Sequence, residues 1–440
     1  MASLVTEGRA DDAVVHPAPT TKGRRLFPWV VFTLTFALLL SDYMARQALS
    51  SVFAFLKLEW ALTDTQLGAL TSVVALTVGL LAVPLSLLGD RWGRVRSIVL
   101  MAFVWSLATA GSAIAANYEQ LMLARVFIGV GEAAYGSVGL AVVLAVFPAY
   151  RRASFTGAFM AGGSFGSVLG VALGGALAVQ FGWRWSFAAM ALPGFALVAL
   201  YRLFISDKKL DAHRVDDVAE GEPVSTTGGR AKLRTLFSTP SVIAAYVGSG
   251  LQLFIAGSLF AWLPSYLNRA YGLAPDKAAG VAAIAILFMG LGMIVCGAVT
   301  DRLSRHMAIR KWTTAIVYTT ASLVFLGVGF SLQPGGAQLL LLAVGVFFAA
   351  GTSGPAGAMV SNLTHESIRA TAFGTLTLAN NLLGLAAGPL VTGILADRIG
   401  LEGALKIMPI VAVGALIALL IGRKAYPKSL AKVNAPAVTR

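Results

Sequence analysis

The sequence is dominated by apolar stretches that are long enough to cross a lipid bilayer. Each has roughly 20 residues or more, which at 1.5 Å per helical residue spans a hydrocarbon core of ~30 Å. Only 12% of the 440 residues are charged, about half the ~25% of a soluble domain. The pattern predicts an all-α membrane protein with twelve transmembrane helices. We place them at 27–56, 65–89, 95–116, 119–146, 153–180, 184–206, 240–270, 276–300, 309–330, 337–363, 367–395 and 402–423.

A polar stretch at 207–239 divides these segments into two groups of six. Its mixed charges and its Gly, Ser, Thr and Pro content are typical of a solvated linker. We therefore expect one six-helix bundle at 27–206 and a second at 240–423, joined by a cytoplasmic linker. The ends of the chain, 1–26 and 424–440, are predicted to be cytoplasmic tails, the first of them disordered.

The basic residues are distributed very unevenly between the two sides of this predicted topology. With both termini in the cytoplasm, the cytoplasmic side holds 26 Lys and Arg and the opposite side six. This bias is the positive-inside pattern of membrane proteins. It accounts for the net charge of +14 without any nucleic-acid partner.

The two halves also resemble each other. The Asp-Arg pair at 90–91 recurs at 301–302, which is 211 residues later. The glycines of the fifth segment begin at Gly166, and a similar series begins at Gly384, 218 residues later. The similar offsets indicate a duplicated six-helix unit, a plan known among membrane transporters.

Two short motifs lie at the ends of the predicted helices. The loop after the second segment reads GDRWGRVR from Gly89 to Arg96, and FGWRWSF follows the fifth segment at 181–187. With the six-plus-six layout, these motifs resemble the Major Facilitator Superfamily. The resemblance implies a latch at the cytoplasmic ends of the helices, which stabilises the outward-facing state. Its residues are Asp90, Arg91, Gly93, Arg94, Asp301 and Arg302.

Within that superfamily the sequence resembles the Spinster-like transporters. The residues that carry this resemblance are the stretches 105–109, 123–133 and 262–266, which read WSLAT, LARVFIGVGEA and WLPSY. The resemblance implies lysolipids or phosphorylated sphingoid bases as solutes and a proton-linked carboxylate and arginine. The family places an acid immediately before an arginine in the first helix, whereas this chain has Ala45 before Arg46 and its acid at Asp42.

Four ionisable residues lie deep within predicted helices, all in the first half of the chain. Counted along the helices, Asp42 and Glu132 lie about 22 Å and about 21 Å from the cytoplasmic end, with Arg46 and Arg125 in the next layer. Charges inside a membrane are costly and usually functional. We predict that Asp42 and Glu132 carry the proton as a coupled pair and that Arg46 and Arg125 bind an anionic solute. The alternative is an ion-pair network that only holds the first and fourth helices together.

Polar side chains of the second half are candidates for lining a cavity, or for hydrogen bonds between helices. They are Gln252, Trp262, Ser353, Asn380 and Asn381. All four histidines lie in predicted tails or loops, and the single cysteine, Cys296, lies in an apolar stretch. We therefore predict neither a metal site, a cofactor nor an enzymatic activity.

These features together predict a secondary active transporter that works by alternating access in the cell membrane. We expect it to be monomeric and proton-coupled, with an amphiphilic, lipid-like or drug-like solute as partner. The alternative is a proton symporter of the same fold that carries a water-soluble organic anion.

Overall fold

The computed structural model describes residues 22–148, 151–213, 236–237, 239–365 and 368–434, and the regular structure in these ranges is helical. The first half contains α1 (Lys22–Ser51), α2 (Phe53–Trp60), α3 (Asp64–Trp92), α4 (Arg94–Ile114), α5 (Tyr118–Glu132), α6 (Tyr135–Ala145), α7 (Arg152–Phe181), α8 (Trp183–Phe204) and α9 (Asp207–Ala212). The second half contains α10 (Pro240–Tyr271), α11 (Pro275–Ser304), α12 (Arg310–Ser331), α13 (Gly336–Ala349), α14 (Ser353–Asn362), α15 (Arg369–Ala379), the π-helix η4 (Asn380–Ala386), α16 (Ala387–Ile407), the 3₁₀ turn η5 (Met408–Ile410) and α17 (Val411–Asn434).

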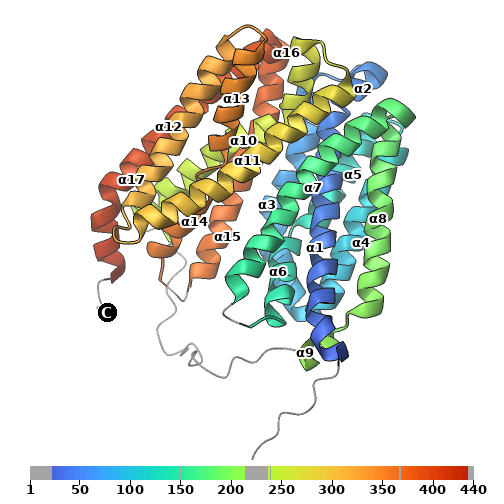
Figure 1. Ribbon diagram of the computed structural model, residues 1–440, viewed down its shortest axis with the longest axis vertical. Coiled ribbons are helices and arrows are strands. Elements are labelled where there is room, and N and C mark those ends of the chain that lie inside the picture. The colour runs from blue at the N-terminus through green and yellow to red at the C-terminus, as the bar shows by residue number, and fades with distance from the viewer. Residues whose placement is uncertain (1–21, 149–150, 214–235, 238, 366–367, 435–440) are drawn as a thin grey trace, which may run out of the picture.

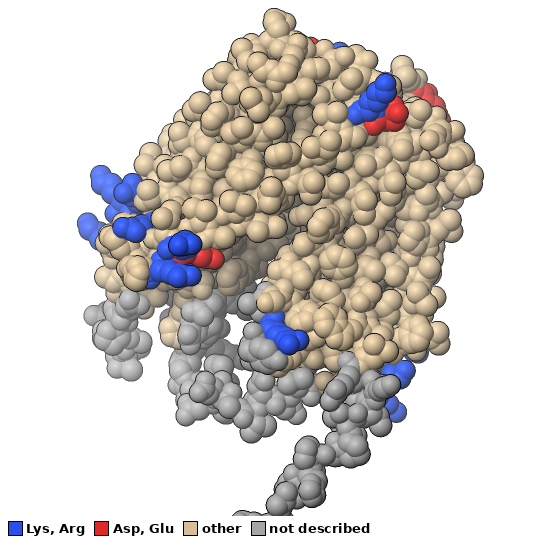
Figure 2. All heavy atoms as spheres, viewed as in Figure 1, with Lys and Arg blue, Asp and Glu red and all other residues tan. Residues whose placement is uncertain are grey.

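The helices form two bundles that stand side by side, one from each half of the chain (Figure 1). We call the face at which α1 begins and α9 lies the terminal face, and the face that carries α2 the far face. Charged side chains gather towards the ends of the bundles, whereas the surface between them is almost entirely uncharged (Figure 2). A surface of this kind suits a lipid environment, so the predicted all-α membrane fold is confirmed.

Eleven segments are long and apolar enough to cross a membrane in the described part of the chain. The last of them, Thr371–Val433, has 63 residues, which is far more than the roughly 20 that one crossing needs. The chain turns within it at Gly400, whose φ of 76° lies in the left-handed region. This length is consistent with the predicted twelve crossings.

Two broken helices show the internal repeat directly. The fourth membrane segment is interrupted between α5 and α6, and the tenth is interrupted between α13 and α14. All four helix boundaries of the first pair recur 217 or 218 residues later in the second pair. The interruption therefore belongs to the duplicated unit and not to one half alone.

Parts of the predicted domain organisation lie outside the described residues. These are most of the tail 1–26, the linker from residue 214 to 235, and the last six residues of the tail 424–440. At the edges of these parts, α1 already begins at Lys22, α9 occupies the start of the predicted linker, and α17 continues to Asn434.

The glycines of α7 allow it to pack closely along α1. A Cβ atom at Gly166 would lie 2.5 Å from the carbonyl oxygen of Leu40, and one at Gly170 would overlap the backbone of Met44. One at Gly174 would lie 2.6 Å from the hydroxyl of Ser51. The four-residue spacing of these glycines therefore serves backbone contact between two helices, as in other membrane bundles.

We predict that Gly170→Ala destabilises the protein by about 1–3 kcal/mol, the usual cost of overfilling a packed contact. The measurement is the melting temperature of the purified protein in detergent. Gly157→Ala is the matched control in the same helix, because no atom beyond the adjacent backbone of its own helix lies within 4 Å of a Cβ at that position. Equal melting temperatures for the two variants would contradict this account of the α1–α7 contact.

Candidate functional site

A cavity of about 740 Å³ lies between the two bundles, and the molecular surface is hollowed there (Figure 2). Its wall in the first half is formed by α1, α3, α5 and α6, and its wall in the second half by α15 and η4. Ser86 and Arg94 line it where α3 ends and α4 begins, which is at the terminal face. The cavity therefore opens towards the face that we predict to be cytoplasmic.

Three of the four deep ionisable residues line this cavity. Arg46 donates a hydrogen bond from Nη1 to Oε2 of Glu132 at 3.2 Å. Asp42 lines the same cavity as Glu132 and is only 3% exposed. Oδ1 of Asp42 and Oε1 of Glu132 are both buried without a donor. The site thus combines two adjacent carboxyl groups, each with an unsatisfied oxygen, and one arginine.

Arg125 lies behind this group and does not line the cavity. It is completely buried, and it donates from Nε to the carbonyl oxygen of Leu70 at 3.3 Å and from Nη2 to that of Arg46 at 3.1 Å. Its remaining terminal nitrogen, Nη1, has no partner. Arg125 therefore links α5 to the backbones of α1 and α3 and places a positive charge next to the carboxyl pair.

Of the polar candidates in the second half, Asn381 lines the cavity. Its amide nitrogen donates to the carbonyl oxygen of Thr377 at 2.9 Å. The others do not line it; they are Gln252, Trp262, Ser353 and Asn380. Gln252 instead donates to the carbonyl oxygen of Ala349, a hydrogen bond between α10 and the end of α13.

The π-helix η4 brings Asn381 to the cavity wall. It packs tightly against α3 and α10. A Cβ atom added at Gly79 of α3 would lie 2.9 Å from the Cβ of Asn381, and a Cβ atom added at Gly250 of α10 would lie 2.9 Å from the Cβ of Leu383. π-Helical turns are rare and frequent at functional sites. This element is not predicted from the sequence, because NNLLGLA has the composition of an ordinary apolar helix.

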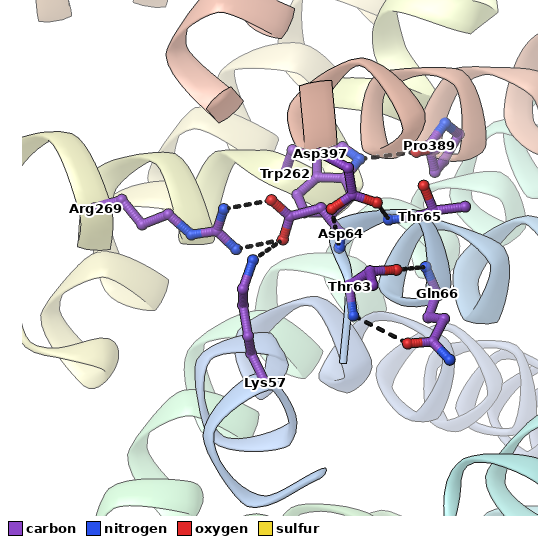
Figure 3. Close-up of polar contacts among 9 residues, drawn as sticks. All are labelled: Lys57, Thr63, Asp64, Thr65, Gln66, Trp262, Arg269, Pro389 and Asp397. Carbon is purple, nitrogen blue, oxygen red and sulfur yellow. Dashed lines mark hydrogen bonds and ion pairs between the residues drawn. The ribbon is translucent and has the colours of Figure 1, made fainter. Parts of the chain in front are cut away.

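At the far face the two bundles are held together by charged side chains (Figure 3). Asp64, at the start of α3, accepts hydrogen bonds from both terminal nitrogens of Arg269 on α10, at 2.8 and 2.7 Å. Lys57 of α2 donates to the same carboxylate at 2.6 Å. Paired hydrogen bonds between arginine and a carboxylate are among the stronger polar contacts in proteins.

A second carboxylate crosses between the bundles at the same place. Asp397 of α16 accepts from the backbone nitrogens of Asp64 at 2.7 Å and of Thr65 at 2.9 Å (Figure 3). A carboxylate in this position satisfies free N–H groups of the first turn of α3 and is favoured by the helix dipole. We call Lys57, Asp64, Arg269 and Asp397 the far-face latch.

The far-face latch is not among the predictions from the sequence. In the sequence, Lys57 and Arg269 are two of the six basic residues on the less basic side of the membrane, and no motif marks Asp64 or Asp397. The one signal for the latch in the sequence is Asp64, an acid directly before the predicted second helix. Its partner lies 205 residues away, a distance that helical spacing cannot bridge.

The residues of the predicted cytoplasmic latch lie at the terminal face, but they are not joined there. The side chain of Asp90 is outside the described residues. Arg91, Asp301 and Arg302 are exposed, and Arg94 lines the cavity. In the described part of the chain, no hydrogen bond or ion pair connects these residues across the bundles. The protein is thus closed at the far face and open at the terminal face.

Two helical bundles around a cavity that is open at one face define a multi-pass membrane transporter. The chain belongs to the Major Facilitator Superfamily, whose family model matches residues 35–385. The predicted resemblance to the Major Facilitator Superfamily is therefore confirmed.

The curated relatives of the chain include a Spinster homologue and two transporters that are named for sugar acids. The human protein spinster homolog 1 is 25% identical over 380 residues, which cover 82% of this chain and 71% of that protein. The hexuronate transporter of Bacillus subtilis is 23% identical over 396 residues, or 87% and 93% of the two chains. The probable L-galactonate transporter of Escherichia coli is 30% identical over 292 residues, or 64% and 63%.

The fold is also that of a solved transporter. A bacterial homologue of the human lysosomal transporter Spinster, in its inward-facing and unoccupied conformation, superimposes with a TM-score of 0.81. The match covers 93% of this chain and 99% of that one, at 18% identity. The predicted resemblance to the Spinster-like family is thus confirmed, as is the location in a cell membrane.

We predict that Asp64→Asn opens the far face. The substitution removes the charge that pairs with Arg269 and Lys57, and partly exposed pairs of this kind contribute roughly 0.2–1 kcal/mol each. The loss of both pairs, about 0.4–2 kcal/mol, changes the ratio of closed to open protein roughly two- to thirtyfold. Distances between spin labels at the start of α3 and the end of α10, both at the far face, measure this ratio.

Glu59→Gln is the matched control at the same face. Glu59 accepts hydrogen bonds from Trp183 and Arg184, which belong to its own bundle. Slight burial raises the pKa of Glu59, but these two hydrogen bonds hold it below its usual value overall, so the substitution removes a charge at neutral pH. If Glu59→Gln opens the far face as much as Asp64→Asn, the latch has no specific role.

Proposed function

We propose that this transporter carries an organic anion together with a proton. The observation that carries the proposal is the contact on the cavity wall between Arg46 and Glu132. The carboxyl group of Asp42, the second of the cluster, lines the same cavity. Arg46 is the cation of this cluster that reaches the cavity, since its side chain is 14% exposed and Arg125 is buried.

The charges of the cluster balance when both acids are ionised. Asp42 and Glu132 contribute two negative charges, and Arg46 and Arg125 contribute two positive ones. An unbalanced charge in a low-dielectric interior is costly. One bound proton leaves a net charge of +1, and one bound anion restores neutrality. Proton and anion therefore favour each other's binding, which is the requirement for cotransport.

The same contacts suggest the order of events. While Glu132 is ionised it occupies Nη1 of Arg46 and competes with a solute for it. A proton on the carboxyl pair weakens this contact and frees the guanidinium, which binds carboxylate or phosphate groups through two hydrogen bonds. Asp42 and Glu132 each have a buried oxygen without a hydrogen-bond partner, and we infer that one proton is shared between the two carboxyl groups.

The far-face latch supplies the other half of the transport cycle. In the described conformation it closes the far face while the cavity is open at the terminal face. We propose that the opposite conformation breaks this latch and joins Asp90, Arg91, Gly93 and Arg94 with Asp301 and Arg302 of the second bundle. Solute and proton would then reach the carboxyl pair from one face at a time.

The rest of the cavity wall constrains the solute. Polar groups such as Tyr43 and Asn381 accompany Arg46, which suits a small acid like the hexuronate and galactonate in the names of two relatives. A second candidate is an amphiphilic anion, because Val78, Val83 and Phe373 give the same cavity an apolar side. In both cases the acidic group would bind Arg46.

We predict that Glu132→Gln abolishes uptake driven by a pH gradient and retains binding of the solute. The amide preserves the shape of the side chain and removes the proton site and one negative charge. Uptake is measured in liposomes with an imposed pH gradient, and binding by the shift in melting temperature. Accumulation at the normal rate by the variant would exclude Glu132 from proton coupling.

Glu402→Gln is the control for this experiment, because Glu402 is an exposed acid of α16 outside the cavity. The double variant Asp42→Asn with Glu132→Gln tests whether the two acids act as a pair. If they share a proton, the pH dependence of solute binding in the double variant differs from the sum of the two single changes.

We predict that Arg46→Lys weakens binding of the anion at least about tenfold. Lysine keeps the charge but loses the planar fork that binds an acid through two hydrogen bonds. Isothermal titration with sugar acids and with lysophospholipids measures the affinity and also separates the two candidate solutes. The site accepts the solute that the wild type binds and for which the substitution lowers the affinity.

Arg94→Lys is the matched control, since Arg94 also lines the cavity but lies at its opening. It should leave the affinity unchanged. An equal loss in both variants would mean that only the overall positive charge of the cavity attracts the solute, and Arg46 would not be the anchor.

A further inference from the structure

A second hollow, of about 500 Å³, lies on the outside of the first bundle. It is formed where α4 begins, where α8 ends and where α9 follows, at the terminal face (Figure 1). It shares no lining residue with the transport cavity. The mechanism proposed above does not use it.

The floor of this groove is apolar and belongs to the surface that faces the lipid. It is lined by Val95, Val99, Leu100 and Phe103 of α4 and by Val198 of α8. Leu100 is 48% exposed and Phe103 is 44% exposed. Both α4 and α8 lie in segments that are apolar enough to span a membrane, so an acyl chain can reach this floor from the bilayer.

The rim of the groove is basic. Arg96, Arg202 and Lys208 line it and are exposed. Asp207 also lines it, but its Oδ1 accepts the backbone N–H of Val95 at 3.1 Å and so is directed at the start of α4. With three cations and one carboxylate, the rim has a formal charge of +2 at the level where lipid headgroups lie.

We propose that this groove binds one phospholipid with an anionic headgroup. Its phosphate would lie between Arg96, Arg202 and Lys208, and one acyl chain would lie along Leu100 and Phe103. Basic pockets between helices at the cytoplasmic surface are known to bind anionic headgroups. The combination of a charged rim with an apolar floor open to the membrane favours a lipid over a soluble phosphate.

The position of the groove connects it to the transport cycle. Asp207 lies against Gly93 as well as Val95, and Arg94 between them lines the transport cavity. A lipid bound to Arg96 would therefore hold the first turn of α4, next to the loop that we expect to join the second bundle when the terminal face closes.

Native mass spectrometry of the detergent-solubilised protein tests the proposal. The probes are dioleoylphosphatidylglycerol and dioleoylphosphatidylethanolamine, which have the same acyl chains and differ in headgroup charge. We expect the first bound molecule of phosphatidylglycerol to have about tenfold higher affinity than the first molecule of phosphatidylethanolamine. The triple variant Arg96→Gln, Arg202→Gln and Lys208→Gln should abolish this preference. The matched control is Arg305→Gln, Arg423→Gln and Lys428→Gln, which are exposed cations of the second bundle.

The proposal is overturned if the wild type shows no preference for phosphatidylglycerol, or if both triple variants lose it equally. Glycerol phosphate at the same concentration should not displace the lipid, and displacement would rule out the contribution of the apolar floor. The melting temperature without lipid checks that the triple variants remain folded. A normal melting temperature with lost preference assigns the effect to the groove.

Discussion

The buried charges of the first bundle must neutralise one another, and much of the structure follows from this requirement. An unpaired charge in such an environment costs several kcal/mol. Arg125 donates hydrogen bonds to the backbones of two neighbouring helices, and Glu132 accepts a hydrogen bond from Arg46. The cluster thereby ties α1, α3 and α5 together. Helix α5 ends at Glu132, so the break in the fourth membrane segment lies directly at the charged site.

The second bundle has no comparable cluster among its described residues, and it contributes in other ways. It supplies Arg269 and Asp397 to the far-face latch, and it supplies the π-helix to the cavity wall. Its buried Trp262 donates to the carbonyl oxygen of Pro389 beside this latch. The duplicated unit has thus diverged into one half that holds the ionisable groups and one half that closes around them.

The sequence predicted those features that depend on local spacing. Hydropathy located the membrane segments, and helical spacing with depth placed Asp42, Arg46 and Glu132 in one region of the fold. Depth could not show that Arg125 turns to backbone carbonyls, because the direction of a long side chain depends on the neighbouring helices. The latch between Asp64 and Arg269 depends on how two distant helices meet, and no periodicity within either of them records that contact.

The far-face latch also makes the protein responsive to the medium on that side. The side chains of Arg269 and Lys57 are 30% and 39% exposed, so dissolved ions reach the pairs that they form with Asp64. The Debye length falls from about 10 Å at 0.1 M salt to about 3 Å at 1 M. Salinity at the far face would therefore shift the resting balance of conformations without any change in solute or in proton concentration.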